Sequence, residues 1–555
     1  MSGSTGTVNQ LNRRSVITGD AVGGHSDGIP VSRRIRVTAG AAGLFLTLIA
    51  VWLSAGGDFL LRRSLWMDEV HTWILVSDPD PGHALSALAD GVDYNPPGYY
   101  LLARMAGWLP GGLSSYRLRL FSLGCVIAAL LAVYLLGCRR FSPFVSATAV
   151  LCMSGHALLI QQVTEIRFYA LWLAAAAWLC WLLDHRQRRE SLWQTPLSMG
   201  LAALICTCHY FGIFSLVLVL SGSCVFRRDR ASLRFHAAVL LTGLVSLLLC
   251  WPFLAGQRAA LTRPTWITPP TAGDSLNYLL AATPLSAVVM LLAGVSAAAV
   301  ISGLDRRSVI SSLSLAWRTP GVALAAMPAV LVAFAWLIQP ALVLRYAVTG
   351  AIGFVPLLAA LISLQGRKGQ TLCFAVGVMC SFHAVQQSVR QWQDQETQRE
   401  RLATVTRELP EQRAVLFEDR TVWLPLVCAH PQLLDRCYLA DFADSQMAVD
   451  SNLRAVQRDV GRRIAKWYPQ YQLRSLASLR ADEDFLIVPY SGGGFRDLHY
   501  PTGREILEYQ PGIYWFSHTQ KPVPAESGRR EGEKTMKNAA DERQMTEKNF
   551  DNRSR

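Results

Sequence analysis

The sequence predicts an α-helical membrane protein of about eleven spans, followed by a small extracytoplasmic α/β domain. Of its 555 residues, 51% are hydrophobic and only 17% are charged, whereas about 25% of the residues in a soluble domain are charged. The apolar residues form long uncharged runs, and the basic residues lie in short clusters between these runs. A net charge of +13 spread in this way is typical of a polytopic membrane protein and does not indicate a nucleic-acid partner.

The spans are predicted from runs that lack Asp, Glu, Lys and Arg, because a helix needs about 20 apolar residues to cross a bilayer. These runs cover residues 37–55, 120–137, 141–164, 168–183, 191–226, 235–257, 275–304, 319–344, 346–366 and 369–389. The run 191–226 is too long for one span, and the pair His209-Tyr210 marks a turn that divides it. The shorter stretch 94–110 opens with Pro96-Pro97 and is expected to form an interfacial helix.

The basic clusters orient these spans, because cytoplasmic loops are enriched in Lys and Arg. With the N-terminus in the cytoplasm of an inner (plasma) membrane, every predicted inside loop is basic, as at Arg139-Arg140 and Arg367-Lys368. A full span at 94–110 would turn the later clusters outward. The periplasmic or extracellular side then holds the first loop (56–119), the turns at 165–167 and 209–210, the loop 258–274, and all residues after about 390.

The chain is predicted to divide into four parts: a disordered cytoplasmic tail (1–36), the membrane domain (37–389), an extracytoplasmic α/β domain (390–520) and a disordered tail (521–555). In the third part, apolar runs at 414–419, 421–428, 484–491 and 512–517 resemble β-strands, and 446–466 has helical spacing. Cys428 and Cys437 lie in this part, where they either form a disulfide or remain two thiols.

Two adjacent acids, Asp68 and Glu69, stand in the first loop among the apolar residues Trp66, Met67 and Val70. They either mark the point where the chain leaves the bilayer or are buried near its surface. Buried acids need partners or a role.

Other charged residues are predicted on the same face. Glu165 and Arg167 form either a local ion pair or part of the same site. External arginines run against the usual charge bias, and they suit anionic partners such as phosphate groups or lipid headgroups. They include Arg258, Arg263 and Arg345.

Six short motifs in a fixed order resemble those of the GT-C membrane glycosyltransferases. The similarity is greatest to the branch of bacterial proteins that resemble dolichyl-phosphate-mannose–protein mannosyltransferases and lipid A aminoarabinose transferases. The motifs are MDEVHTW (67–73), NPPGYYLLAR (95–104), RLRLFS (117–122), EIRFYALW (165–172), HYFG (209–212) and LRYAV (344–348). Their order and spacing match over about residues 1–390, and Asn95 stands where many relatives have His or Asp.

The resemblance implies an enzyme that moves one hexosyl or pentosyl group from a polyprenyl-phosphate donor to a cell-envelope lipid, glycan or protein, with inversion. It implies Asp68 as the base, and Glu69 and Glu165 as groups that orient the acceptor, a water or a divalent metal; no other cofactor is expected. The implied donor-phosphate residues are Arg167, Arg258, Arg263 and Arg345. The implied pocket residues are Tyr99, Tyr100, Tyr169, His209, Tyr210 and Tyr346.

Two other classes of function are compatible with a membrane protein of this composition. A transporter or flippase of lipid-linked sugars would carry acids deep inside its spans, whereas here the spans are nearly free of charge. A receptor or scaffold would act through the external C-terminal domain.

Overall fold

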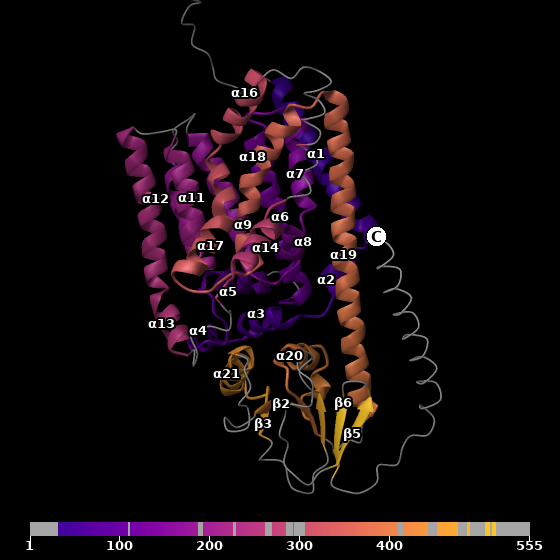
Figure 1. Ribbon diagram of the computed structural model, residues 1–555. Helices are drawn as coiled ribbons and strands as arrows, with labels where there is room; N and C mark the ends of the chain where they lie inside the picture. Colours follow the sequence, from indigo (N-terminus) through magenta and orange to yellow (C-terminus); the bar gives the residue numbers. More distant parts are fainter. Residues whose placement is uncertain are drawn as a thin grey trace, which may run out of the picture.

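The structure is a computed structural model that describes residues 31–108, 112–186, 193–225, 229–260, 269–284, 292, 306–408, 414–441, 452–475, 485–488, 505–510 and 513–517. Most helices run side by side in one bundle, and a smaller β-sheet lies beyond one end of it (Figure 1). Short helices of the first loop lie between these two parts (Figure 1). The predicted tail 521–555 and most of the tail 1–36 lie outside the described residues.

The bundle consists of long helices and shorter ones. The long helices are α1 (Val31–Ser54), α6 (Ser115–Gly137), α9 (Tyr169–Arg186), α12 (Arg230–Leu249) and α19 (Arg367–Glu408). The shorter elements are α7 (Pro143–Ser154), α8 (Ala157–Val163), α10 (Gln194–Cys208), α11 (Gly212–Cys224), α13 (Trp251–Ala259), α14 (Ala272–Ala282), α16 (Arg306–Trp317), η2 (Pro320–Ala326), α17 (Met327–Leu337), η3 (Leu344–Ala347) and α18 (Gly350–Ser363).

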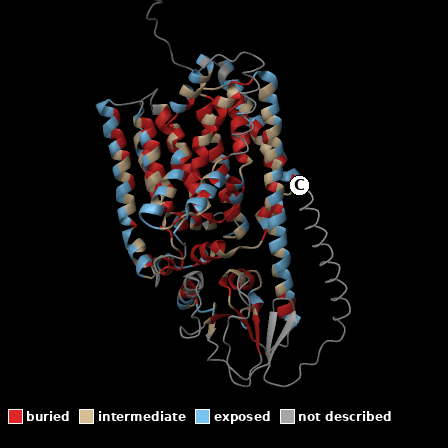
Figure 2. Ribbon diagram, viewed as in Figure 1, coloured by how far each residue is buried: buried red, intermediate tan, exposed pale blue. Residues whose placement is uncertain are grey.

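Within the described ranges, five helices are long and apolar enough to cross a membrane, or six if α7 and α8, which are bent by 80°, form one span. The count of eleven spans stays a prediction. Buried residues fill the middle of the bundle, and exposed ones line the outer helices α12 and α19 (Figure 2). Exposed side chains there include Leu244, Leu248, Leu372 and Met379. Such apolar outer faces are those of an integral membrane protein.

The first loop folds into short helices: α2 (Asp58–Arg62), α3 (Met67–Ser77), α4 (Pro81–Ala89), α5 (Gly98–Met105) and η1 (Ala106–Trp108). Helix α5 falls within the stretch predicted to be interfacial, and it packs against α3 and α10. The approach to α10 is close at Gly98, where a Cβ atom would lie 2.8 Å from the backbone oxygen of Thr207. Only glycine fits this contact, which fixes α5 against α10.

The C-terminal region holds a six-stranded sheet in the order β3-β2-β1-β4-β6-β5. Its strands are β1 (Ala414–Phe417), β2 (Cys437–Asp441), β3 (Leu473–Ser475), β4 (Phe485–Val488), β5 (Glu505–Gln510) and β6 (Ile513–Ser517). The first four strands pair in parallel, and β6 and β5 are antiparallel. Parallel neighbours need crossover connections, and α20 (Arg420–Ala429) and α21 (Asn452–Trp467) supply two of them.

One strand prediction is wrong, because residues 421–428 form most of α20. The Asp419 side chain accepts a hydrogen bond from the backbone N–H of Thr421 at 2.7 Å and so caps the helix. The segment has an unbroken apolar run because α20 is buried between the sheet and α3 (Figure 1). Such a run does not distinguish a strand from a buried helix. Cys428 and Cys437 are both free thiols.

Candidate functional site

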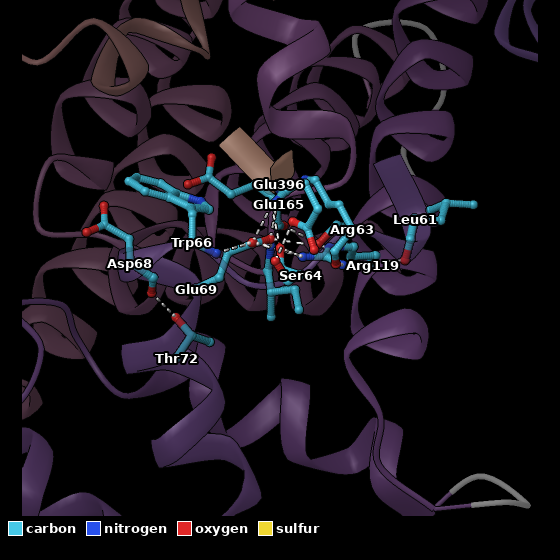
Figure 3. A network of polar contacts seen from close by, with 12 residues as sticks. Leu61, Arg63, Ser64, Trp66, Asp68, Glu69, Thr72, Arg119, Glu165 and Glu396 are labelled. Carbon is cyan, nitrogen blue, oxygen red and sulfur yellow. Dashed lines mark hydrogen bonds and ion pairs between the residues drawn. The ribbon is translucent and has the colours of Figure 1, made fainter. Parts of the chain in front are cut away.

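The first turn of α3 carries both acids of the first loop. Trp66 is the N-cap residue, and its backbone N–H donates to the Glu69 carboxylate at 3.2 Å. Acids are favoured in this turn because the N-terminal end of a helix carries a partial positive charge. Both residues are buried, with 8% of Asp68 and 0% of Glu69 exposed, and their side chains point in different directions (Figure 3).

Glu69 is held by arginines on both carboxylate oxygens (Figure 3). Arg63 Nη1 lies 2.7 Å and Arg119 Nη2 3.0 Å from Oε2, and the backbone N–H of Ile166 donates to Oε1 at 2.9 Å. Burial alone would raise the pKa of Glu69, but Arg119 and Arg63 overcome it and hold the pKa at about 2. Glu69 is therefore an ionised centre that joins α3, α6 and the turn at 165–167.

Asp68 has a different partner. Arg345 in η3 places Nη2 2.6 Å from Asp68 Oδ2, and the side chains of Arg345 and Asp68 remain 26% and 12% exposed. The Arg345 guanidinium lies 5.3 Å from the ring centre of Trp66 and 5.8 Å from that of Tyr169. Aromatic faces attract cations at such distances. The rings and Asp68 together fix Arg345 at a partly open position.

Glu165 is 4% exposed, and its Oε1 has no hydrogen-bond partner in the described part of the chain. Its backbone oxygen accepts from the Ser122 hydroxyl at 2.7 Å. Burial raises the pKa of Glu165 to about 7, against the opposing effect of Arg345. A buried carboxyl group that titrates near neutrality can give or take a proton, and such groups gather at functional sites.

Arg167 forms an ion pair with Asp93, a residue that the sequence-based site did not include. Arg167 Nη1 also donates to the Asp68 backbone oxygen and to Thr72 Oγ1, both at 3.1 Å. Asp93 further accepts from the Tyr100 hydroxyl at 2.7 Å. Burial would raise the pKa of Asp93, but Arg167 holds it at about 2. The signal for Asp93 was its place three residues before Pro96-Pro97.

The aromatic residues predicted to line a pocket occupy three places. His209 stacks on Phe168 at 4.7 Å between ring centres, and Tyr346 lies 4.7 Å from His209 and 6.5 Å from Tyr169, on the side of Arg345. Burial lowers the pKa of His209 to about 3, so this ring is neutral. Tyr99 and Tyr100 lie together in α5 near Asp93, with ring centres 6.0 Å apart. Tyr210 donates to Gln257 Oε1 at 2.9 Å.

The predicted phosphate-binding arginines do not all converge. Arg345 and Arg167 lie at the site, Arg258 is exposed on α13, and Arg263 lies outside the described residues. No group of three or more His, Cys, Asp or Glu residues in the described ranges could hold a metal ion. Since Asp68, Glu69 and Asp93 are each paired with arginine, these carboxylates do not fit a divalent metal in this arrangement.

The arrangement of the helical bundle, the acid-bearing first loop and the C-terminal sheet is a GT-C fold, as the order of the motifs predicted. The chain is similar to the crystal structure of ArnT from Cupriavidus metallidurans bound to undecaprenyl phosphate, with a TM-score of 0.55 and 11% identity over 88% of this chain and 100% of that chain.

Two other solved structures are less similar. The apo state of the same ArnT has a TM-score of 0.46 at 12% identity over 87% of this chain and 100% of that chain. The archaeal oligosaccharyltransferase AglB from Archaeoglobus fulgidus, in complex with an inhibitory peptide and a dolichol-phosphate, has a TM-score of 0.40 at 11% identity over 87% of this chain and 75% of that chain. No protein-family model matches the sequence, and no curated protein matches it.

Proposed function

We propose that this protein is a glycosyltransferase that moves a single sugar from a polyprenyl-phosphate donor to a lipid, glycan or protein of the cell envelope. The observation that carries the proposal is the meeting of the buried Asp68 and Glu165 with the partly exposed Arg345, from three distant segments, at one site. The fold shared with ArnT, whose solved structure holds undecaprenyl phosphate, supports the class of donor.

The charge at the site suits an anionic donor. In the described part of the chain the cluster combines four arginines with four acids: Arg63, Arg119, Arg167 and Arg345 with Asp68, Glu69, Asp93 and Glu165. Because Glu165 has a pKa of about 7 and is not fully ionised near neutral pH, the four arginines are not fully balanced, which favours a ligand that brings negative charge.

Arg345 is the proposed phosphate ligand. Arg63 and Arg119 are committed to Glu69, and Arg167 is committed to Asp93. Arg345 is partly exposed, and its buried Nε has no hydrogen-bond partner among the described residues. A guanidinium group with a donor to spare matches the oxygens of a phosphate.

Asp68 is the proposed base. A phosphate that binds Arg345 competes with Asp68 for the same guanidinium, and the carboxylate is then available to accept a proton from the acceptor hydroxyl or amine. The acceptor atom bonds to the anomeric carbon on the face opposite the phosphate, which inverts that carbon. The bond from this carbon to the phosphate oxygen breaks, and its electron pair leaves with the phosphate, where Arg345 stabilises the charge.

Glu165 and Glu69 have different proposed roles. With a pKa of about 7 and an unpartnered oxygen, Glu165 suits a group that orients the acceptor and exchanges protons with it. Both carboxylate oxygens of Glu69 accept hydrogen bonds from arginines or a backbone N–H. We therefore assign Glu69 to positioning α3. The proposed location of the site is the outer face, with eleven spans and a cytoplasmic N-terminus, and with the C-terminal α/β domain outside the cytoplasm.

The test compares the wild-type chain with Asp68→Asn in cells that lack the native gene. Mass spectrometry of envelope lipids, glycans and proteins should reveal a component that gains one sugar with the wild type, and Asp68→Asn should lower this gain by about 100-fold or more. Binding of undecaprenyl phosphate to the purified full-length variant should persist. Asp274→Asn, which alters an exposed helix cap, is the matched control.

Two results would contradict the proposal. Wild-type levels of sugar transfer in Asp68→Asn would remove the base assignment. Movement of lipid-linked sugar across the membrane without any transfer to an acceptor would instead favour the flippase.

A further inference from the structure

Helix α20 brings the C-terminal region against the candidate site. It begins at Arg420, directly after β1, and packs on α3 (Figure 1). The cap by Asp419 fixes where the helix starts, so Arg420 stands in its first turn. Arg420 is 4% exposed, and its Nε has no hydrogen-bond partner within the described segments.

Arg420 contacts α3 through a histidine that lies one helical turn beyond Asp68. Arg420 Nη1 is 3.0 Å from His71 Nε2. A guanidinium group can only donate, so Nε2 of His71 accepts and the ring is neutral with its proton on Nδ1. Residues three apart share one face of a helix, so His71 lies on the face of α3 that carries Asp68.

The first turns of α3 are therefore held by arginines from two distant segments. Arg167, in the turn before α9, donates to the backbone oxygen of Asp68 and to Thr72. Arg420, from the C-terminal region, donates to His71. Together they set the rotation and height of the turn that presents the Asp68 carboxylate to Arg345.

Docking of the C-terminal region onto the first loop does not depend on Arg420. Lys466 Nζ and Trp467 Nε1 each donate to Asp90 at 2.7 Å, and the Tyr468 hydroxyl donates to Asp78 at 2.9 Å. Asp90 is the C-cap of α4, and Asp78 is the C-cap of α3. Loss of Arg420 is thus expected to leave the two parts in contact and to remove its hydrogen bond to His71 near the start of α3.

We propose that Arg420 is a positioning residue through which the C-terminal region aligns Asp68 for sugar transfer. This inference rests on the proposed function. It makes α20 part of the catalytic apparatus, although Arg420 itself acts through α3 and does not touch the reacting atoms.

A change in pH dependence separates this role from simple support of the fold. His71 faces Asp68 and Asp93, which favour its protonation, and Arg167 and Arg420, which oppose it. Burial and Arg420 lower the pKa of His71 to about 3. Removal of the Arg420 charge raises the pKa of His71, so the His71 ring becomes protonated at a higher pH.

The experiment uses the full-length chain in membranes from the cells described above. Arg420→Gln should lower the rate of sugar transfer by about tenfold or more, as expected for a misplaced catalytic group. Its affinity for undecaprenyl phosphate should stay within about twofold of the wild type, because Arg345 is intact. Below neutral pH the rate of Arg420→Gln should fall further than that of the wild type, and the double variant with His71→Gln should lose this extra fall.

Two further variants serve as controls. Arg420→Lys keeps the positive charge and should restore the wild-type pH profile. Lys466→Gln removes a docking contact that is 63% exposed and should change the rate by less than about twofold.

Hydrogen exchange of the amides gives a readout that does not need an acceptor. In Arg420→Gln, exchange should quicken across residues 67–77 and stay unchanged across 81–89, which α21 holds. If the wild type transfers no sugar, the proposed function fails, and exchange still tests the link between α20 and α3. The positioning role is overturned if Arg420→Gln transfers sugar at the wild-type rate. It is also overturned if the variant loses rate, donor affinity and thermal stability in parallel, or leaves exchange at 67–77 unchanged.

Discussion

Asp68 and Glu69 are neighbours in the sequence, but they belong to two different environments. Glu69 is fully buried between Arg63 and Arg119. Asp68 meets the partly exposed Arg345. Successive residues of a helix point about 100° apart, so one acid turns toward α6 and the other toward η3. The fully buried ion pairs of Glu69 stabilise the fold. In the Asp68–Arg345 ion pair the arginine is partly exposed, so a ligand can replace Asp68 as its partner.

The largest expected effect comes from removing the negative charge of the buried Glu69. Glu69→Gln leaves Arg63 and Arg119 buried without a counter-charge, which should cost about 3–5 kcal/mol of folding free energy. The measurement is thermal unfolding of the purified protein beside Asp68→Asn. The comparison between the two acids fails if Asp68→Asn destabilises the protein as much as Glu69→Gln does.

The next largest expected effect is that of Glu165 on the pH dependence of folding stability. Its folded-state pKa of about 7 lies above the usual value of 4.5, so the folded state binds the proton more tightly. The resulting stability is fully present below about pH 4.5, declines as the pH rises to 7, and is absent above it, a change of at most about 3 kcal/mol. Glu165→Gln should remove this decline from melting curves recorded at pH 5 and pH 8.

Asp394, an exposed residue of α19, supplies the control for that experiment. Asp394→Asn should leave the pH dependence of the melting temperature as it is in the wild type. A Glu165→Gln protein that kept the full wild-type decline would show that Glu165 is ionised throughout this range.

The smallest expected effect concerns the partly exposed Asp68–Arg345 ion pair. Arg345→Met removes charge-assisted hydrogen bonds to phosphate, worth about 1.5–3 kcal/mol, and should weaken undecaprenyl phosphate binding by about 10- to 100-fold. Calorimetric titration of the purified full-length protein measures this loss. Arg462→Met, which removes an exposed ion pair with Asp441, is the matched control. Unchanged affinity in Arg345→Met would mean that the phosphate lies elsewhere.

Charge-free runs, which are local signals, predicted a helical membrane bundle, and the resemblance of the ordered motifs predicted the fold shared with ArnT. It also picked out Asp68, Glu165 and Arg345, which the structure brings together. Ion pairs between residues far apart in the sequence could not be predicted from such local signals. Arg167 was expected beside Glu165 or a phosphate, yet it pairs with Asp93 across 74 residues of sequence. Arg420 was not singled out, because residues 421–428, directly after it, were interpreted as a strand.

Helix α19 continues without a break from the bundle toward the sheet. At 1.5 Å per residue its 42 residues extend about 63 Å, roughly twice the hydrocarbon thickness of a bilayer. Its outer half touches the first loop, where Trp392 stacks on Arg63 and Glu396 accepts from Ser64. A flexible tether would let the sheet drift above the membrane. This continuous helix holds the sheet at a fixed distance from the bundle. For the proposed sugar transfer, we therefore expect a bulky acceptor to enter from the side.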